Sequence, residues 1–222
     1  MSAVPGVICR LSFAALRHAE VLDLSDARQL AARLYYYNRA PAAPEWTRRL
    51  SNPNLAAAYV RLPAHDADQA ISGGWFIWLP RRPGAHKLYM SPTCEHLAEV
   101  FCATRALRPT GLKLGANVHN LVRPDKLMAY FATVDELHEC AERLATKLKG
   151  CPAHGVPFTA EIAGDGLLSW GIDRPSTSWR RWLTRKLARA MLAAPPGSDQ
   201  ARFALQRTRD TGLTPDPWSG ME

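Results

Sequence analysis

The chain has 222 residues, 47% of them hydrophobic, so it is long enough to bury the core of one domain. Lys and Arg number 28 against 20 Asp and Glu, and the resulting formal charge of +8 favours partners that carry negative charge. The five cysteines form no CxxC pair, which argues against a disulfide framework or a zinc knuckle. No export signal and no membrane-spanning apolar run is present, so we expect a soluble, cytoplasmic protein without a membrane partner.

The N-terminal third is predicted to be helical and then irregular. Residues 25–39 place Leu30, Leu34 and Tyr37 at helical spacing behind a serine cap, which predicts a helix that ends before a proline-rich stretch. Residues 41–74 mix Pro, Asn and Asp with short apolar pieces, which indicates irregular structure with one short helical turn. We therefore treat residues 1–74 as a helical and irregular segment.

Strands and helices are predicted to alternate from residue 75 to residue 175. Short β-prone runs at 75–80 and 87–92 flank the turn-rich sequence RRPGAH and predict a hairpin. Apolar spacing predicts two helices, and short apolar runs predict four further strands. The helices are expected at 93–107 and 134–148, and the strands at 111–115, 126–131, 158–162 and 167–171. The predicted fold is a single α+β domain with a short, mostly antiparallel or mixed sheet flanked by helices.

The C-terminal part, residues 176–222, is predicted to be a basic helix followed by a loose tail. The helix, at 176–194, carries five cations: Arg180, Arg181, Arg185, Lys186 and Arg189. Such a face can bind an acidic leader peptide or a kinase partner. The pattern favours a solvated amphipathic helix that packs Trp182, Leu183 and Leu187 on the core, and the two interpretations are compatible. The last two dozen residues are polar and contain prolines, so we expect them to be loose.

Cations and phenols stand inside the predicted strands. Lys87 and Tyr89 share a face, because residues two apart in a strand point the same way. Lys113 stands between Leu112 and Leu114, where burial of a bare ammonium is costly and lowers its pKa. Since a neutral amine can take a proton, Lys113 is a candidate general base.

A structural interpretation competes with the catalytic one. Taken singly, each lysine is more often one that extends from the solvent face of a half-exposed sheet, with Asp125 as a salt-bridge partner. Tyr89 and Tyr130 are likewise more often core phenols. Only the combination of these residues favours a catalytic site.

The motifs follow one another in a set order over residues 34–175: LYYYNR, LSNPN, GGW, KLYMSP, GLKLG, RPDKLMAYF, GVPFTAEI and LLSWGIDRP. This order resembles the Hop A-type effector family of bacteria. That family is similar to the phosphothreonine lyases of type III secretion and to the lyase domains of class III and class IV lanthipeptide synthetases. The resemblance implies a phosphothreonine-lyase-like fold. It also implies β-elimination of phosphate from phosphoserine or phosphothreonine, leaving dehydroalanine or dehydrobutyrine, with no metal and no cofactor.

The resemblance also implies roles for individual residues. Lys113 matches the general base, and Lys87 matches the lysine of a lysine-x-histidine strand. Arg123 and Lys126 fall where the family gathers phosphate and substrate contacts. Tyr89 stands where the effector lyases and the synthetase lyase domains carry a histidine as general acid, although Hop A-type members also show tyrosine there. A tyrosine can donate its proton if nearby cations lower its pKa.

Other positions stay open between binding and structural roles. His86 is a weaker substitute for the acid, because it faces away from Lys87 in an ideal strand. Tyr130, Thr159 and Arg39 complete the expected substrate contacts, although an ordinary strand is favoured at Thr159 and a local turn cap is equally possible at Arg39. The sequence holds no HxxxH spacing, GxSxG, Walker loop or GxGxxG, so zinc-enzyme, hydrolase, NTPase and dinucleotide functions lack support.

The expected function is a lyase in ribosomal peptide (RiPP) modification of the lanthipeptide type. Its partners would be a phosphorylated precursor peptide, a separate kinase and a cyclase. One alternative is a non-catalytic peptide-binding scaffold that partners a kinase, which the missing histidine favours. A second is a secreted effector acting on host phosphoproteins, although residues from Leu11 onward indicate a helix and not a disordered secretion segment. Nucleic acid is the least supported partner, because aromatic residues are not interleaved with the basic ones.

Overall fold

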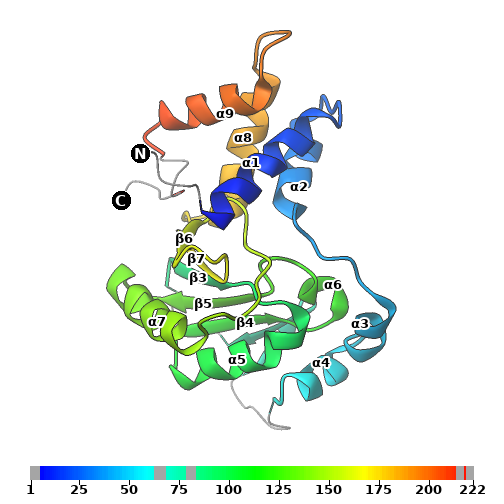
Figure 1. The fold of residues 1–222 in the computed structure, drawn as a ribbon, viewed down its shortest axis with the longest axis vertical. Helices are drawn as coiled ribbons and strands as arrows, with labels where there is room; N and C mark the ends of the chain where they lie inside the picture. The colour runs from blue at the N-terminus through cyan, green and yellow to red at the C-terminus, as the bar shows by residue number, and fades with distance from the viewer. Residues whose placement is uncertain (1–5, 63–68, 79–83, 214–217, 219–222) are drawn as a thin grey trace.

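An antiparallel sheet of seven strands forms the centre of the computed structural model, which describes residues 6–62, 69–78, 84–213 and 218 (Figure 1). The strand order is β1-β2-β4-β5-β3-β7-β6, and every neighbouring pair is antiparallel. The strands are β1 (Ala70–Ser72), β2 (Trp75–Trp78), β3 (His86–Met90), β4 (Gly111–Gly115), β5 (Leu127–Phe131), β6 (Ala160–Ile162) and β7 (Leu168–Ile172). The predicted single α+β domain with a mostly antiparallel sheet is confirmed.

The hairpin predicted between residues 75–80 and 87–92 is wrong. β2 pairs with β1 and β4, whereas β3 pairs with β5 and β7, so β4 and β5 separate the two predicted partners. The hairpin that does form joins β1 to β2 through Gly73 and Gly74, which have φ values of 57° and 78°. A two-residue turn with positive φ at both positions matches the twist of paired strands, and glycine adopts it without strain. Residues 79–83, within the predicted hairpin, lie outside the described residues.

Helices account for most of the remaining described chain. They are α1 (Val7–Glu20), α2 (Ala27–Tyr36), α3 (Pro44–Arg49), α4 (Pro53–Tyr59), α5 (Leu97–Ala106), α6 (Val118–Leu121), α7 (Val134–Lys147), α8 (Trp179–Leu192) and α9 (Gln200–Arg209), with a 3-10 turn, η1 (Cys94–His96), before α5. Asp26, and not the expected serine, caps α2 by accepting a hydrogen bond from Gln29 N at 2.7 Å. None of the helices in the described ranges has the length and apolar character needed to cross a bilayer.

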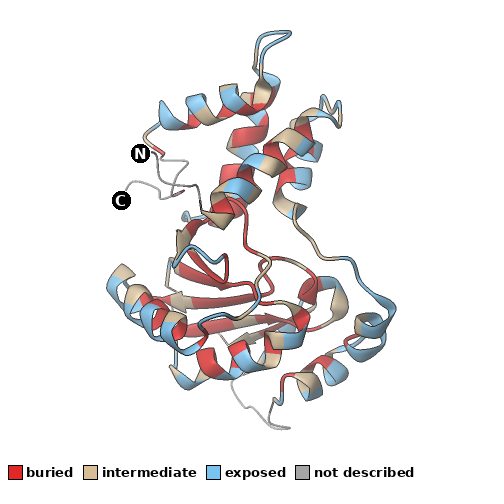
Figure 2. Ribbon diagram, in the orientation of Figure 1, coloured by how far each residue is buried: buried red, intermediate tan, exposed pale blue. Residues whose placement is uncertain are grey.

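The two faces of the sheet carry different side chains, because successive residues of a strand point to opposite sides. Leu88, Leu112, Leu114 and Ala129 belong to the apolar face and pack with α5 and α7 into the main core. Figure 2 shows buried residues running through the sheet and along the helix sides that face it. The opposite face carries the cations and phenols, and α2 and α8 lie on that side (Figure 1).

A second core joins the N-terminal and C-terminal helices. Residues of α1, α2, α8 and α9 form one buried cluster that also includes Phe158. Trp179 ties this cluster to the sheet region, because its indole Nε1 donates to the Phe158 carbonyl at 2.9 Å. The loose tail predicted from residue 199 onward is wrong for α9, where Ala201 and Ala204 are fully buried. Residues 214–217 and 219–222 of that predicted tail lie outside the described residues.

Candidate active site

The polar face of the sheet is hollowed into a cavity of about 360 Å³, which we call the active cavity. Its floor comes from β2 to β5, and its walls come from α2, the segment before β5 and the start of α8. The floor residues are Trp75, Lys87, Tyr89, Lys113, Met128 and Tyr130, and the wall residues are Tyr35, Tyr36, Arg123, Asp125, Ser176, Thr177, Ser178, Arg180 and Arg181. Five of the expected site residues therefore meet at one place: Lys87, Tyr89, Lys113, Arg123 and Tyr130.

Strand register explains why the floor residues converge. Lys87 lies directly opposite Tyr130, and both Tyr89 and Lys113 lie opposite Met128 on either side of β5. Directly opposed residues of an antiparallel pair place their side chains on the same face. Neighbouring strands thus bring together positions that are far apart in the chain.

Lys113 is the exceptional cation of the active cavity. Its Nζ lies 4.6 Å from the centre of the Trp75 ring but forms no hydrogen bond or ion pair with any residue in the described ranges. Burial lowers the pKa of Lys113, and the charges of Lys87 and Arg123 lower it further. A partly desolvated amine without a carboxylate partner is well suited to accept a proton.

Lys87, by contrast, is held by a carboxylate. Its Nζ donates to Asp173 Oδ2 at 2.5 Å, and only 4% of the residue is exposed. The same Nζ lies 5.1 Å from the centre of the Tyr130 ring. Asp173 also accepts a hydrogen bond from the backbone N of Trp179 at 2.9 Å, so it links β3 to the first residue of α8. Lys87 therefore offers a positive charge in a fixed position.

A second carboxylate, Asp125, fixes two arginines at once. Arg123 Nε donates to one oxygen of Asp125 at 2.8 Å, and Arg180 Nη1 donates to the other at 2.8 Å. Arg123 also donates to the hydroxyl of Tyr35 at 3.0 Å. Burial alone would raise the pKa of Asp125, but the two guanidinium groups outweigh it and hold that pKa well below its usual range. Asp125 therefore stays ionised and keeps both arginines in place.

The phenols have raised pKa values. Burial raises the pKa of Tyr89 well above its ordinary value and outweighs the charge of Arg180, so nearby cations do not lower it. Burial raises the pKa of Tyr130 as well. Both side chains therefore stay protonated at neutral pH and act as neutral hydrogen-bond donors. His86, the weaker substitute, does not line the active cavity and contacts the Ala132 carbonyl at 3.2 Å instead.

Three expected substrate contacts lie outside the active cavity, so the structure corrects their placement. Lys126 is fully buried and donates to the Pro92 carbonyl at 2.7 Å. Thr159 is also fully buried and donates to the Val156 carbonyl at 2.5 Å. Arg39 donates to the His119 carbonyl and lines a different hollow. Lys126 and Arg39 each tie one chain segment to another, and Thr159 does so through a second hydrogen bond, to Ser169 Oγ of β7 at 2.8 Å.

The buried Lys126 has a second partner in His154, whose Nδ1 lies 2.9 Å from Lys126 Nζ. Burial lowers the pKa of Lys126 to about 8, and burial together with the lysine charge lowers the pKa of His154 to about 4. At neutral pH a charged lysine therefore donates to a neutral imidazole. Together with the bond to the Pro92 carbonyl, this pair holds the segment after β3 in place.

Sequence reasoning missed several residues of the active cavity. Tyr35, Trp75 and Arg180 were not proposed as site residues, and Asp125 was proposed only as a partner for lysines. The motifs LYYYNR, GGW and RPDK each contain one of them, but no local spacing shows that they meet. Among the described residues, no group of three or more His, Cys, Asp or Glu side chains is arranged to hold a metal ion.

The fold and the active cavity define a class: an α+β protein whose antiparallel sheet carries a cation-lined cavity on one face. The sequence matches no protein-family model and no curated protein. Solved structures do share the fold. An effector protein from Pseudomonas syringae pv. syringae strain 61 has a TM-score of 0.59 at 14% identity, over 97% of this chain and 98% of that chain. An effector protein from Pseudomonas syringae pv. tomato strain DC3000 has a TM-score of 0.56 at 14% identity, over 93% and 95%.

A third similar structure is the phosphothreonine lyase SpvC, an effector protein from Salmonella. Its TM-score is 0.42 at 12% identity, over 81% of this chain and 100% of that chain. The fold of the present chain is that of the two Pseudomonas syringae effector proteins, in line with the effector-family fold that the sequence resemblance implied.

Proposed function

We propose that this protein is a lyase that removes phosphate from phosphothreonine or phosphoserine side chains of a peptide by β-elimination. One observation carries the proposal: the unpaired Lys113 amine shares a cavity with cations that carboxylates hold in place. The sequence resemblance to effector lyases and synthetase lyase domains supports the same reaction. The product would be dehydrobutyrine from phosphothreonine and dehydroalanine from phosphoserine.

The base in this proposal is Lys113. Its neutral Nζ takes the proton from Cα of the phosphorylated residue, and the electron pair of that C–H bond forms the double bond between Cα and Cβ. The bond between Cβ and oxygen breaks, and phosphate leaves. The lowered pKa of Lys113 supports this role, because it raises the share of neutral amine near neutral pH.

The charge balance of the active cavity favours a phosphate group. Besides the neutral Lys113 amine, four cationic side chains line it: Lys87, Arg123, Arg180 and Arg181. The carboxylates that touch these cations are Asp125 and Asp173, so positive charge is left over for a dianionic ligand. Cations that are already held in position stabilise the negative charge that develops on a leaving group. They do so without having to move during the reaction.

The proton for the departing phosphate comes from Tyr89 in this proposal. The phosphate oxygen released from carbon is strongly basic, so even a phenol with a raised pKa can protonate it. Tyr89 lies beside Lys87, whose Nζ is 5.9 Å from the centre of its ring and would stabilise the phenolate that forms. Solvent then removes the proton from Lys113 and returns one to Tyr89.

The substrate, the partner proteins and the cellular compartment are proposed from the sequence resemblance. We propose a ribosomal precursor peptide of the lanthipeptide type as the substrate, phosphorylated by a separate kinase and later processed by a cyclase. This setting would place the protein in the cytoplasm. The support is the resemblance of residues 34–175 to lyase families that act on such peptides.

A second candidate is a secreted effector that removes phosphate from host phosphoproteins. The two similar structures from Pseudomonas syringae are both named effector proteins, and the fold covers nearly the whole of each. Both candidates use the same reaction at the same active cavity. They differ only in the protein that presents the phosphorylated side chain.

Mass spectrometry of phosphopeptides tests the proposal. The purified protein is incubated with a library of synthetic phosphothreonine and phosphoserine peptides, and each product is weighed. Elimination removes phosphoric acid from the peptide and leaves a double bond that thiols add to, whereas hydrolysis restores the hydroxyl. We expect loss of phosphoric acid. Binding without any change in mass would instead support the non-catalytic scaffold, and restored hydroxyl groups would support a phosphatase.

A further inference from the structure

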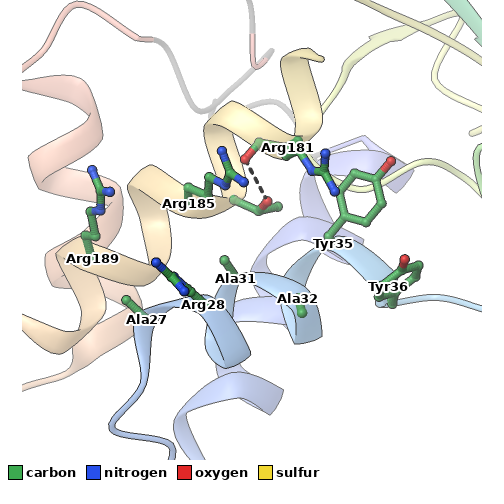
Figure 3. A pocket seen from close by; sticks show the side chains of 10 residues that line it. Ala27, Arg28, Ala31, Ala32, Tyr35, Tyr36, Arg181, Arg185 and Arg189 are labelled. Atoms are coloured by element: carbon green, nitrogen blue, oxygen red, sulfur yellow. Dashed lines mark hydrogen bonds between the residues drawn. The ribbon is translucent and has the colours of Figure 1, made fainter. Parts of the chain in front are cut away.

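A second hollow, of about 430 Å³, lies between α2 and α8 on the outside of the molecule (Figure 3). We call it the basic groove. Its floor includes Ala27, Ala31 and Ala32 of α2, whose small side chains leave room for a ligand backbone. The remaining lining residues are Arg28, Tyr35, Tyr36, Arg181, Thr184, Arg185 and Arg189.

The basic groove adjoins the active cavity. Tyr35, Tyr36 and Arg181 line both hollows. A ligand in the basic groove therefore lies next to the active cavity. This adjacency makes the groove a place for another part of the same ligand.

The arginines of the basic groove have no partners within the described part of the chain. Arg28, Arg181, Arg185 and Arg189 are all exposed, and none of their guanidinium groups forms a hydrogen bond or ion pair with a residue in the described ranges. Arg181, Arg185 and Arg189 recur every four residues, so they form one stripe along α8, with Arg28 of α2 beside it (Figure 3). Like charges at this spacing destabilise a helix, so the stripe does not stabilise the fold. An anionic ligand would reduce this repulsion.

We propose that the basic groove binds an acidic segment of the peptide whose phosphorylated residue enters the active cavity. The identity of that peptide rests on the proposed function. Arg181 and Arg189 are eight positions apart on the helix, which is about 12 Å at 1.5 Å per residue. An extended peptide covers that length with about four residues. The groove therefore selects a run of about four acidic residues next to the phosphorylated one.

The test uses three fluorescent phosphothreonine peptides of the same length. One carries four glutamates before the phosphothreonine, one carries them after it, and one carries four glutamines. Binding is measured by anisotropy and elimination by mass, each at low salt. We expect one of the glutamate peptides to show a Kd and a KM about tenfold lower than those of the glutamine peptide.

Charge-reversal variants test whether the groove arginines cause the preference for a glutamate peptide. The double variant Arg185→Glu, Arg189→Glu is expected to bring the Kd and KM of the preferred glutamate peptide up to those of the glutamine peptide. The matched control, Arg207→Glu, Arg209→Glu, makes the same change in charge on α9, away from the groove, and is expected to keep the preference. Circular dichroism checks that both variants fold.

Each outcome separates the two proposals. Binding of the glutamate peptide that depends on Arg185 and Arg189, without elimination of any peptide, keeps the groove and removes the lyase. Equal values for all three peptides, or equal losses in the α9 control, would overturn the acidic-segment proposal even if elimination occurs. Tighter binding of a single-stranded RNA oligonucleotide than of the glutamate peptide, lost in the groove variant, would overturn it in favour of nucleic acid.

Discussion

Two neighbouring residues of α8, Arg180 and Arg181, show how differently this molecule uses positive charge. Arg180 is 1% exposed and bound to Asp125, whereas Arg181 is exposed and has no partner in the described chain. Lys87 and Arg123 of the active cavity are held by carboxylates as Arg180 is, whereas Arg28, Arg185 and Arg189 of the basic groove resemble Arg181, which lines both hollows. Paired, buried cations have fixed positions and suit a reaction, while unpaired, exposed cations suit a flexible anionic ligand.

Lys113 breaks this pattern inside the active cavity, because it is partly buried and unpaired. Lys113→Ala is expected to lower kcat for elimination by about 10² to 10⁴, the usual contribution of a general base. Phosphopeptide binding should persist, since Lys87 and Arg123 remain. The rate is measured by phosphate release, with added methylamine as a test of chemical rescue. Activity of Lys113→Ala equal to that of the parent would remove Lys113 from the mechanism.

The pH dependence of elimination by the parent protein is a second test of the role of Lys113. A base works in its neutral form, so kcat/KM is expected to rise with pH through the pKa of Lys113. Because burial and then the neighbouring cations lower that pKa, the midpoint of the rise should lie below the pKa of an ordinary lysine. A rise at or above the ordinary lysine range, measured by phosphate release across pH, would show that Lys113 is not perturbed as described.

Two aspartates that each bridge two arginines allow the buried and exposed environments to be compared directly. Asp125 pairs with Arg123 and Arg180 in the interior, and Asp199 pairs with Arg17 and Arg202 at the surface. Asp125→Asn should lower the free energy of unfolding by about 3–5 kcal/mol, because it leaves two buried cations unpaired. Asp199→Asn should change it little, since asparagine also caps a helix well.

Urea unfolding at several pH values measures both variants. Because the pKa of Asp125 is lowered in the folded protein, its contribution is complete above the ordinary aspartate pKa and is lost as the pH falls through the folded pKa. The difference between Asp125→Asn and the parent should therefore shrink in acid. Equal effects of the two substitutions at neutral pH would contradict the contrast between the buried and the surface pairs.

Tyr89→Phe tests the proton donor and should have a smaller effect. We expect a fall in kcat of about tenfold, the scale of one hydrogen bond to a charged group. Water can replace part of the function of the lost hydroxyl, whereas nothing replaces the amine of Lys113. Steady-state kinetics with one phosphothreonine peptide compares the two variants. A loss as large as that of Lys113→Ala would make Tyr89 an essential acid despite its raised pKa.

Salt gives the smallest predicted effect and separates the two cationic regions. Between about 0.1 M and 1 M salt the screening length falls from about 10 Å to about 3 Å. The KM of an acidic phosphopeptide should rise severalfold because the groove arginines are exposed. The kcat should change less, since the paired cations of the active cavity are buried. A larger effect on kcat than on KM would reverse these assignments.

From the sequence we could predict which residues share a face within one strand of the active cavity. We could not predict which distant segments meet there. Alternation along single strands placed Lys87 with Tyr89 and marked Lys113 as unusual, because a period of two is a local property. The β1–β2 turn at Gly73-Gly74 was missed because the preceding segment lacks an apolar pattern. The partnership of Asp125 with Arg180 was also missed, since 55 positions separate the two residues and only the packing of α8 joins them.

The direction of the Tyr89 pKa shift could not be predicted from the sequence either, for a similar reason. Its neighbours in sequence include cations, but the degree of burial is decided by how strands and helices pack around it. Desolvation is a property of the folded molecule and outweighs those charges here. The same reason explains why Lys126, which was expected to contact phosphate, is fully buried and does not line the active cavity.

The isotope effect on phosphate release tests the central claim most directly. A phosphothreonine peptide that the parent enzyme accepts is prepared with deuterium at Cα and compared with the ordinary peptide. If Lys113 removes that proton in the elimination, phosphate should leave the deuterated peptide more slowly, and the product should carry a double bond. Equal rates with a restored threonine hydroxyl would show that water attacks phosphorus and that the active cavity does not catalyse elimination.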